Sequence, residues 1–422
     1  MILPFVLVTT LFFAWGFAND ITNPMVKAFS KIFRMSVTDG ALVQLAFYGG
    51  YFVMAFPAAL FIRKYTYKSG ILVGLGLYAL GALMFIPASI IGNFGPFLLA
   101  YFILTCGLSF LETSANPYIM SMGDPSTATR RLNLAQAFNP IGSLLGMFCA
   151  MNFIQARLHP LDSAGRAELS DAEFEAMKAA DLSILSSPYI LVGLFVVILF
   201  LIILFTSMPK NQDTEHSLNL GPVLKRLLHT PKYREGVIAQ FFYVGAQIMC
   251  WTFIIQYGTR IFMNQGMSEL DAEVLSQRYN IAAMVLFCIS RFICTFLLKY
   301  ISPGRLLSAL AIGGCLLTAG VIGFQNIYGL YCLVAVSGCM SLMFPTIYGI
   351  ALEGLGDDAK FGAAGLIMAI LGGSVMPPLQ ALIIDGGGLA GIPSVHLSFI
   401  IPLLCFVIIT IYGYRTHRFF SN

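Results

Sequence analysis

A carboxylate lies inside an apolar segment of the chain. Glu112 stands about halfway through a run that begins near Phe97, and Asn116 follows it by four residues, on the same helix face. An ionisable side chain at membrane depth is costly and indicates function by default. In a semi-dry cavity burial favours the neutral carboxyl, whereas a nearby dipole or cation favours the charged form. Glu112 is therefore the predicted proton-coupling residue; the alternative is a structural partner for a buried arginine or polar group.

A second polar stripe follows a short turn. Asn133, Gln136 and Asn139 recur at intervals of three residues, so they share one side of a helix. We expect this stripe to face Glu112 and Asn116 across a water-filled cavity that opens alternately to each side of a membrane. Asn116 is a candidate substrate contact in that cavity.

A third stripe lies further along the chain. Gln240, Tyr243, Gln247 and Trp251 are spaced by three, four and four residues, which places them on one helix face. Amides supply both donors and acceptors for sugar hydroxyls, and an indole packs on the C–H face of a sugar ring. The pattern predicts a monosaccharide site; the alternative is polar contact between helices.

Two further positions carry charge near or within apolar runs. Asp20 and Asn23 are three residues apart near the end of the first run, where they could couple a proton, bind substrate or merely cap the helix. Arg291 follows Asn280 by eleven residues and lies nearly on its face. A buried arginine must pair or reach water, so Arg291 is either a structural counter-ion or a substrate contact, and Asn280 is a candidate sugar contact.

The composition is that of a membrane protein. Of 422 residues 58% are hydrophobic and only 10% charged, with a mean hydropathy of +0.82, whereas about a quarter of a soluble domain is charged. No phosphate-binding loop occurs, and the nine cysteines lie in apolar runs without a C-x-x-C pair. We therefore expect no metal, no cofactor, no nucleic-acid partner and no enzymatic activity. The apolar N-terminus lacks a basic region and a cleavage site, which indicates a retained first helix.

The apolar runs are about 20 residues long, as helices that cross ~30 Å of hydrocarbon must be. Twelve spans are predicted at about 1–26, 40–62, 70–90, 95–121, 132–156, 187–208, 235–262, 276–300, 304–324, 327–352, 361–384 and 395–414. The polar interval 209–234 divides them into six-helix bundles at 1–208 and 235–422, joined by a cytoplasmic linker. Ser170 and Glu173 have capping-box spacing, so a short surface helix to about Asp181 is expected.

The two halves show weak internal similarity, as transporter repeats do. The matching pairs are Trp15 with Trp251, Asn116-Pro117 with Phe344-Pro345, and Pro140–Ser143 with Gly372–Ser374. Trp15, like Trp251, is a candidate sugar contact. Pro117 and Pro345 are expected to permit bends inside their spans. Lys and Arg are more frequent in the loops on the side of both termini, which places the termini in the cytoplasm.

Several segments together resemble the fucose:proton symporter family of the major facilitator superfamily over nearly the whole chain. These segments are Phe12–Asn19, Gln44–Phe52, Arg63–Gly70, Leu111–Pro117, Arg131–Asn139 and Ala239–Gln247. The resemblance implies a major facilitator fold of two pseudo-symmetric bundles, alternating access and a central sugar site. It also implies that Glu112 matches the family's membrane-embedded glutamate and that Gln136 and Asn139 match its sugar-contacting pair.

Two positions depart from the family pattern. The first span of the family reads roughly Asn-Asn-x-x-Asp, whereas this chain has Asn19, Asp20 and then Asn23 in the usual acidic position. Asp20, one turn earlier on the same face, could substitute for that acid. The family's tenth-span tyrosine corresponds to Phe344, which removes one hydroxyl.

The sequence predicts an all-α secondary active transporter of the bacterial inner membrane that carries a monosaccharide, L-fucose first, together with a proton. The expected partners are the sugar, the proton and the lipid bilayer, and the expected state is a monomer. The alternatives are a symporter for glucose, galactose or N-acetylglucosamine, and a transport-inactive sugar sensor. The sensor is disfavoured because the polar interval 209–234 is too short to signal alone.

Overall fold

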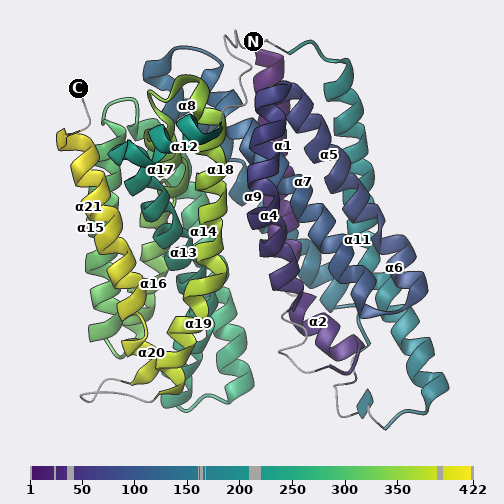
Figure 1. Cartoon of the computed structure of the whole chain (residues 1–422). Helices are drawn as coiled ribbons and strands as arrows, with labels where there is room; N and C mark the ends of the chain where they lie inside the picture. The colour runs from purple at the N-terminus through teal and green to yellow at the C-terminus, as the bar shows by residue number, and fades with distance from the viewer. Residues whose placement is uncertain are drawn as a thin grey trace. The chain divides into compact units, whose positions relative to one another are not determined.

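The computed structural model describes residues 2–22, 25–35, 42–159, 161, 165–166, 168–208, 220–386 and 393–419. Within these ranges the regular elements are all helices (Figure 1). In the described residues eleven helical stretches, some of them made of two consecutive helices, are long and apolar enough to cross a membrane. Leu3–Ala18 is an apolar helix that is shorter than these. Helices satisfy their own backbone groups where no water is available, so apolar composition and helical structure go together. The predicted all-α membrane fold is confirmed.

The helices of the first half of the chain are α1 (Ile2–Thr22), α2 (Met25–Ile32), α4 (Leu42–Lys64), α5 (Tyr67–Leu83), α6 (Phe85–Ile91), α7 (Phe94–Ser121), α8 (Ala128–Gln136), α9 (Asn139–Cys149) and α11 (Asp171–Phe205). Those of the second half are α12 (Leu220–His229), α13 (Pro231–Asn264), α14 (Glu269–Leu297), α15 (Pro303–Gly323), α16 (Ile327–Met340), α17 (Met343–Leu352), α18 (Ala359–Met368), α19 (Gly372–Asp385), α20 (Ser394–Leu397) and α21 (Ile400–Phe419).

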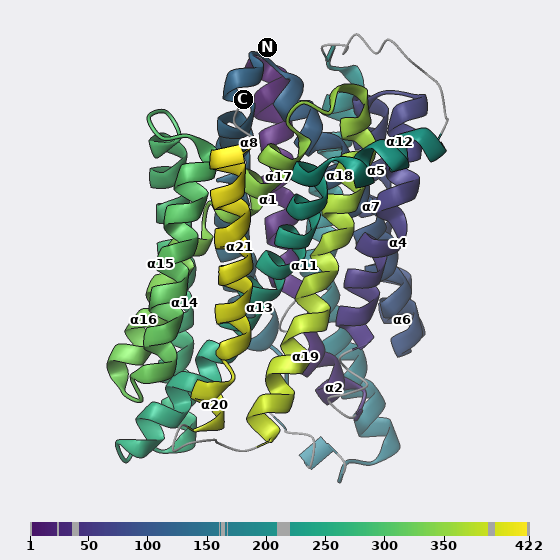
Figure 2. The same cartoon turned by 60° about the vertical axis from the view of Figure 1, so that its left-hand side comes forward.

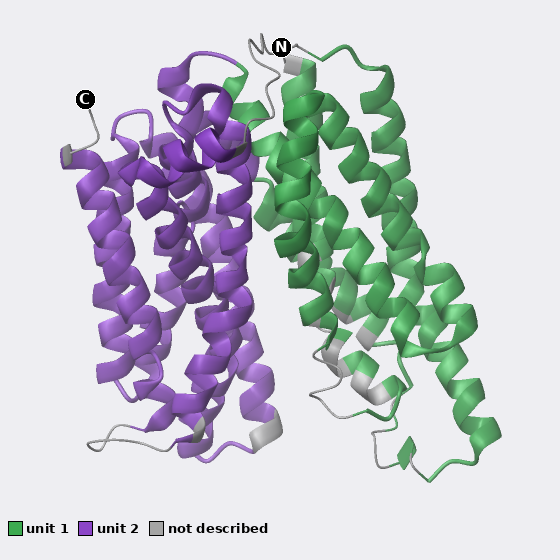
Figure 3. Cartoon of the chain, in the orientation of Figure 1, with its two compact units in different colours: residues 1–122, 138–218 green, residues 123–137, 219–422 purple. Residues whose placement is uncertain are grey.

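The chain forms two compact units (Figure 3). Unit 1 comprises Met1–Met122 and Phe138–Leu218, and unit 2 comprises Gly123–Ala137 and Asn219–Asn422. The fifth predicted span is shared between them, because α8 packs on α14 and α17 in unit 2 whereas α9 packs on α1 in unit 1. The fifth span therefore changes unit between Ala137 and Phe138.

Unit 1 is built around α7, which packs mainly on α4 and α5. Close approach to α5 depends on Gly107, where an added Cβ would lie 2.4 Å from the backbone nitrogen of Tyr78. A second close contact joins α1 to α9, where a Cβ at Gly142 would lie 2.0 Å from the carbonyl oxygen of Phe13. Small residues at such contacts are how membrane helices pack without a hydrophobic driving force between them.

Unit 2 is built around α13, which packs on α14, α17, α19 and α21 (Figure 2). Within the same unit α15 packs on α16 and α21. Three ion pairs link elements of unit 2: Arg226 of α12 with Asp358 before α18, Lys232 of α13 with Glu353 after α17, and Arg415 of α21 with Glu235 of α13.

Several predicted spans are interrupted rather than continuous. The fifth breaks between α8 and α9, and the tenth breaks between α16 and α17. The eleventh contains a 3-10 turn, Ala369–Leu371, between α18 and α19. Pro140 and Pro345 lie in the first turns of α9 and α17, where a missing N–H costs least. By contrast α7 continues through Pro117 without a break.

The turn before α8 is held by the side chain of Asp124. Its carboxylate accepts hydrogen bonds from the backbone N–H and the hydroxyl of Ser126, at 2.8 and 2.7 Å, and these bonds lower the pKa of Asp124 below its usual range. The carbonyl of Asp124 accepts a hydrogen bond from Nη1 of Arg131 at 2.8 Å. These hydrogen bonds hold the first turns of α8 against the turn that precedes them.

The prediction of a separate surface helix after Ser170 is wrong. The capping box of Ser170 and Glu173 forms, but the helix that it starts continues through Pro188 to Phe205 as one 35-residue helix, α11. A proline removes one hydrogen bond from a helix without requiring a break, and packing on α5 supports the rest of α11. At 1.5 Å per residue α11 is longer than the hydrocarbon layer is thick, so it spans the membrane and projects beyond it.

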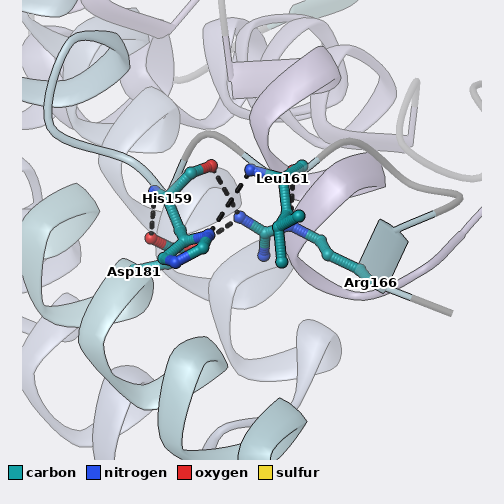
Figure 4. A network of polar contacts seen from close by, with 4 residues as sticks. All are labelled: His159, Leu161, Arg166 and Asp181. Carbon is teal, nitrogen blue, oxygen red and sulfur yellow. Dashed lines mark hydrogen bonds and ion pairs between the residues drawn. The ribbon is translucent and has the colours of Figure 1, made fainter. Parts of the chain in front are cut away.

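The projecting turns of α11 are bound to the preceding loop by a buried polar network (Figure 4). One carboxylate oxygen of Asp181 accepts from the backbone N–H of His159 at 2.9 Å, and the other accepts from Nη2 of Arg166 at 2.6 Å. Arg166 also donates to the carbonyls of Leu161 and His159, and it is fully buried. The carbonyl of Arg166 accepts a hydrogen bond from Arg34, so the network extends to the end of α2.

We expect Asp181→Ala to destabilise the protein by about 3–5 kcal/mol, because it leaves the buried Arg166 guanidinium without its counter-charge. Thermal unfolding of the purified protein in detergent measures this as a lowered midpoint. Glu175→Ala is the matched control on the same helix, since the Glu175–Lys178 pair is largely exposed on its acidic side, and such pairs contribute little. Equal midpoints for both variants would contradict a structural role of the network.

Candidate functional site

Glu112 lies at mid-helix in α7 and is 6% exposed. Its Oε1 accepts a hydrogen bond from the hydroxyl of Tyr51 in α4 at 3.0 Å. The backbone carbonyl of Tyr51 accepts a second bond from the hydroxyl of Ser109, one turn before Glu112, at 3.1 Å. Among the described residues no basic side chain forms an ion pair with Glu112. The predicted acid is therefore buried and has a neutral hydrogen-bond partner.

Asn116 is fully buried, and its side chain turns back to its own helix. Its Nδ2 donates to the carbonyl of Glu112 at 2.9 Å. The next residue, Pro117, lies inside α7 and lacks an N–H. Asn116 thus follows Glu112 along the helix as predicted, but its Nδ2 binds the backbone. A sugar contact through Asn116 stays a prediction.

The second polar stripe does not lie on one continuous helix. Asn133 and Gln136 belong to α8 in unit 2, whereas Asn139 is the first residue of α9 in unit 1. Nδ2 of Asn133 donates to the carbonyl of Thr129 and, at 3.2 Å, to the hydroxyl of Thr346 in α17. Nδ2 of Asn139 donates to the carbonyl of Phe12 in α1 at 3.1 Å. The predicted fifth span is present as one apolar stretch, Pro125–Ile154, but Ala137 and Phe138 interrupt its helix, which helical spacing cannot reveal.

The first span contributes two of the predicted residues to the described structure. Asp20 lies near the end of α1 and interacts electrostatically with Tyr48, three residues before Tyr51 on α4. Trp15 is 3% exposed, with its ring 4.2 Å from that of Phe12, so its indole is packed within unit 1. Asn23, the third predicted residue of this region, lies outside the described residues.

The predicted stripe on α13 falls into a buried and a half-buried part. Gln240 is fully buried, and neither of its amide atoms has a hydrogen-bond partner. Tyr243 is also fully buried and donates to the carbonyl of Met340, the last residue of α16, at 3.1 Å. Leaving a buried amide unsatisfied is costly, so Gln240 is the stronger binding candidate of this pair.

The outer part of the stripe is half-buried and is joined by residues of α14 and α16. Gln247 and Trp251 both retain partial exposure. The indole N–H of Trp251 donates to the hydroxyl of Ser337 at 3.2 Å, and its ring meets that of Phe287 edge-on at 5.0 Å. Oδ1 of Asn280 is buried without a hydrogen-bond partner, which leaves it available as an acceptor.

Arg291 is 3% exposed and binds backbone carbonyls rather than a carboxylate. Its Nε donates to the carbonyl of Ser341 at 2.5 Å, and its Nη1 donates to that of Gln136 at 3.2 Å. The ring of Phe287 lies 4.7 Å from the centre of the guanidinium. The sequence predicts either a structural role or a substrate contact for Arg291. Its contacts in the described residues are those of a structural role.

Tyr51, Ser337 and Phe287 were not identified from the sequence as site residues. Tyr51 lies in the segment Gln44–Phe52, which contributed to the family resemblance but carried no polar stripe. Ser337 lies on a span whose spacing shows no polar pattern, and Phe287 is an apolar residue between Asn280 and Arg291. Each is identified only by the contact that it makes with Glu112 or Trp251.

The fold and these side chains define a multi-pass helical membrane transporter. The described spans contain few charges, and two of their ionisable groups, Glu112 and Arg291, are buried inside the protein. Within the described residues no group of histidine, cysteine and acidic side chains could hold a metal ion.

Residues 8–377 match the Major Facilitator Superfamily. The "L-fucose-proton symporter" of Haemophilus influenzae is 53% identical over 99% of this chain and 97% of its own length. A "Glucose/galactose transporter" of Brucella abortus is 32% identical over 96% of this chain and 92% of its own length. A crystal structure of the Escherichia coli fucose:proton symporter FucP superimposes with a TM-score of 0.88 at 33% identity, covering 98% of both chains. The chain therefore belongs to the major facilitator superfamily, in the family of the fucose:proton symporters.

Proposed function

We propose that this chain is an L-fucose:proton symporter of a bacterial inner membrane and that Glu112 carries the proton. The sugar is supported by the Haemophilus influenzae relative, which bears that name and matches nearly the whole chain at 53% identity. The single structural observation that supports proton coupling is the environment of Glu112, which is buried and bonded to a hydroxyl. A neutral partner lets the carboxyl gain and lose a proton without leaving an unpaired cation behind.

One proton per sugar is sufficient for accumulation. The membrane potential supplies about 2.3 kcal/mol per charge at 100 mV, which corresponds to a roughly fifty-fold concentration of a neutral sugar. Asp20 is the second proposed member of the proton path, because it interacts electrostatically with Tyr48 of α4, three residues before Tyr51, the hydrogen-bond partner of Glu112. This arrangement supports Asp20 as the substitute for the acid that the family places at Asn23.

The sugar is proposed to bind to half-buried groups of unit 2, together with Gln136 of the same unit. A sugar contact through Asn139, which belongs to unit 1, stays a prediction from the family resemblance. Trp251 offers an indole for the C–H face of the ring, Asn280 an unpartnered acceptor, and Gln247 a carboxamide. Gln240 adds a buried donor and acceptor that have no other partner. A site that hydrogen-bonds hydroxyls rejects analogues lacking them, because its own polar groups are then left unpaired.

The remaining features of the proposal concern orientation and organisation. We propose that both termini lie in the cytoplasm, because the basic residues of the loops favour that side. The two six-helix bundles, 1–208 and 235–422, would then be joined by the cytoplasmic interval 209–234. The protein is proposed to work as a monomer.

Purified protein in liposomes should accumulate labelled L-fucose when the external medium is more acidic than the lumen, and uptake should make the medium more alkaline. Competing sugars identify the substrate: unlabelled L-fucose should compete, and D-glucose, D-galactose and N-acetylglucosamine should not. L-Galactose is the matched probe because it differs from L-fucose only by a hydroxyl on the methyl carbon.

Other outcomes have defined meanings. Uptake that ignores the pH gradient would make the protein a facilitator. Strong competition by D-glucose or D-galactose would favour the activity named for the Brucella relative. Binding of sugar without any uptake would favour the transport-inactive sensor.

Glu112→Gln should abolish accumulation of fucose against its gradient, because the amide cannot carry a proton. Exchange of labelled for unlabelled fucose at equal concentrations should persist, since it needs no net proton movement. Glu175→Gln, on the exposed part of α11, is the control and should accumulate fucose normally. Undiminished accumulation by Glu112→Gln would exclude Glu112 as the proton carrier.

Tyr51→Phe should change the pH dependence of uptake without abolishing it. The hydroxyl of Tyr51 stabilises the ionised form of Glu112, so its loss makes proton release less favourable. Uptake should therefore persist to a higher external pH while the maximum rate falls, by roughly ten-fold for the loss of one hydrogen bond to a charged group. A pH profile of initial rates measures both effects, and an unchanged profile would contradict the role assigned to this bond.

A further inference from the structure

Arg291 donates hydrogen bonds to two carbonyls that belong to different spans. These are the carbonyl of Gln136, at the end of α8, and that of Ser341, directly after α16. Within the described part of the chain no carboxylate pairs with this guanidinium, although it is almost fully buried. The question is why a buried charge is held by these two carbonyls.

Both carbonyls lack their helical donor for the same reason. In an α-helix the carbonyl of residue i accepts from the N–H of residue i+4. Four residues after Gln136 stands Pro140, and four residues after Ser341 stands Pro345. Proline has no N–H, so neither carbonyl could be satisfied by a continuous helix. The two acceptors of Arg291 are therefore the two that these prolines leave without a donor.

At membrane depth such a carbonyl has no water to turn to, and leaving it unpaired is costly. The ends of α8 and α16 also carry the partial negative charge of a helix C-terminus, which favours a cation. Arginine suits this position because its planar group presents five donors in a fixed fork and stays charged. Lysine offers a point charge and cannot reproduce that fork.

We propose that Arg291 is a positioning residue that supplies the two hydrogen-bond donors removed by Pro140 and Pro345, and so fixes the ends of α8 and α16 to α14. Gln136, a proposed sugar contact, is the last residue of α8. Ser337, which accepts from Trp251, lies in the last turns of α16. The consequence for sugar binding rests on the proposed function, whereas the link between Arg291 and the two prolines does not.

The test restores the missing donors and asks whether Arg291 is then less needed. Arg291→Met is made in the natural chain and in the Pro140→Ala/Pro345→Ala background, where the N–H groups of the new alanines can reach Gln136 and Ser341. In the natural chain Arg291→Met should lower the thermal midpoint by ~5 °C or more and raise the KM for fucose about ten-fold. In the alanine background both losses should shrink by at least half.

Two controls accompany this cycle. Arg278→Met removes an exposed arginine from the same helix and should change neither quantity. Arg291→Lys keeps the charge but can serve the two carbonyls less well, so it should fall between the natural protein and Arg291→Met. If Arg291→Met does not fold, Arg291→Lys replaces it in both backgrounds.

The proposal is overturned if Arg291→Met costs the same in both backgrounds, because Arg291 would then act through its charge or by touching the sugar. It is also overturned if Arg291→Met leaves the midpoint unchanged. Reduced losses of midpoint in the alanine background would support the proposal even if no variant transported fucose, in which case the proposed function alone would fail.

Discussion

Backbone groups at membrane depth must find their hydrogen-bond partners within the protein, and this constraint accounts for much of the polar chemistry in the spans. Asn139 donates to a carbonyl of α1, Tyr243 to one at the end of α16, and Arg291 to two at helix breaks. A polar residue in an apolar span can therefore be explained in two ways: it binds a ligand, or it supplies a hydrogen bond to a backbone group. The contacts of each side chain, rather than its position in the span, distinguish between them.

Glu112 and Arg291, two ionisable groups at membrane depth, illustrate the difference between these explanations. Arg291 donates to carbonyls that need a hydrogen-bond donor. Because a guanidinium keeps its proton, it remains a donor to these carbonyls at all times. Glu112 is bonded to a hydroxyl, which can accompany either form of the carboxyl. A carboxyl paired with a guanidinium would be held ionised by the strong interaction between the two charges. Separate partners for Glu112 and Arg291 are therefore consistent with a proton carrier and a fixed structural cation in one protein.

Composition and the length of the apolar runs were enough to predict the helical membrane fold, because the bilayer demands both. The apolar run around Glu112 and the helical spacing of the stripe on α13 also predicted polar groups inside the protein, and the structure places these side chains in buried or half-buried positions. Spacing could not show that the stripe from Asn133 to Asn139 crosses a helix break, or that α11 continues through Pro188. It could not identify Tyr51 or Ser337 either, because hydrogen bonds between spans depend on packing. The pair of prolines that explains Arg291 was visible in the sequence, but its meaning required the two carbonyl contacts.

The internal similarity between the halves extends to how their helices touch. A Cβ at Gly142 would lie 2.0 Å from the carbonyl oxygen of Phe13, and one at Gly372 would lie 2.0 Å from that of Phe241. In each case a glycine near a helix break lets a later span approach the first span of its half. The similarity ends at the proline sites, because α7 continues through Pro117 whereas the tenth span breaks before Pro345. Pro117 also withholds an N–H from the carbonyl four residues earlier, that of Thr113, so the two proline sites share a missing donor but not a break in the helix.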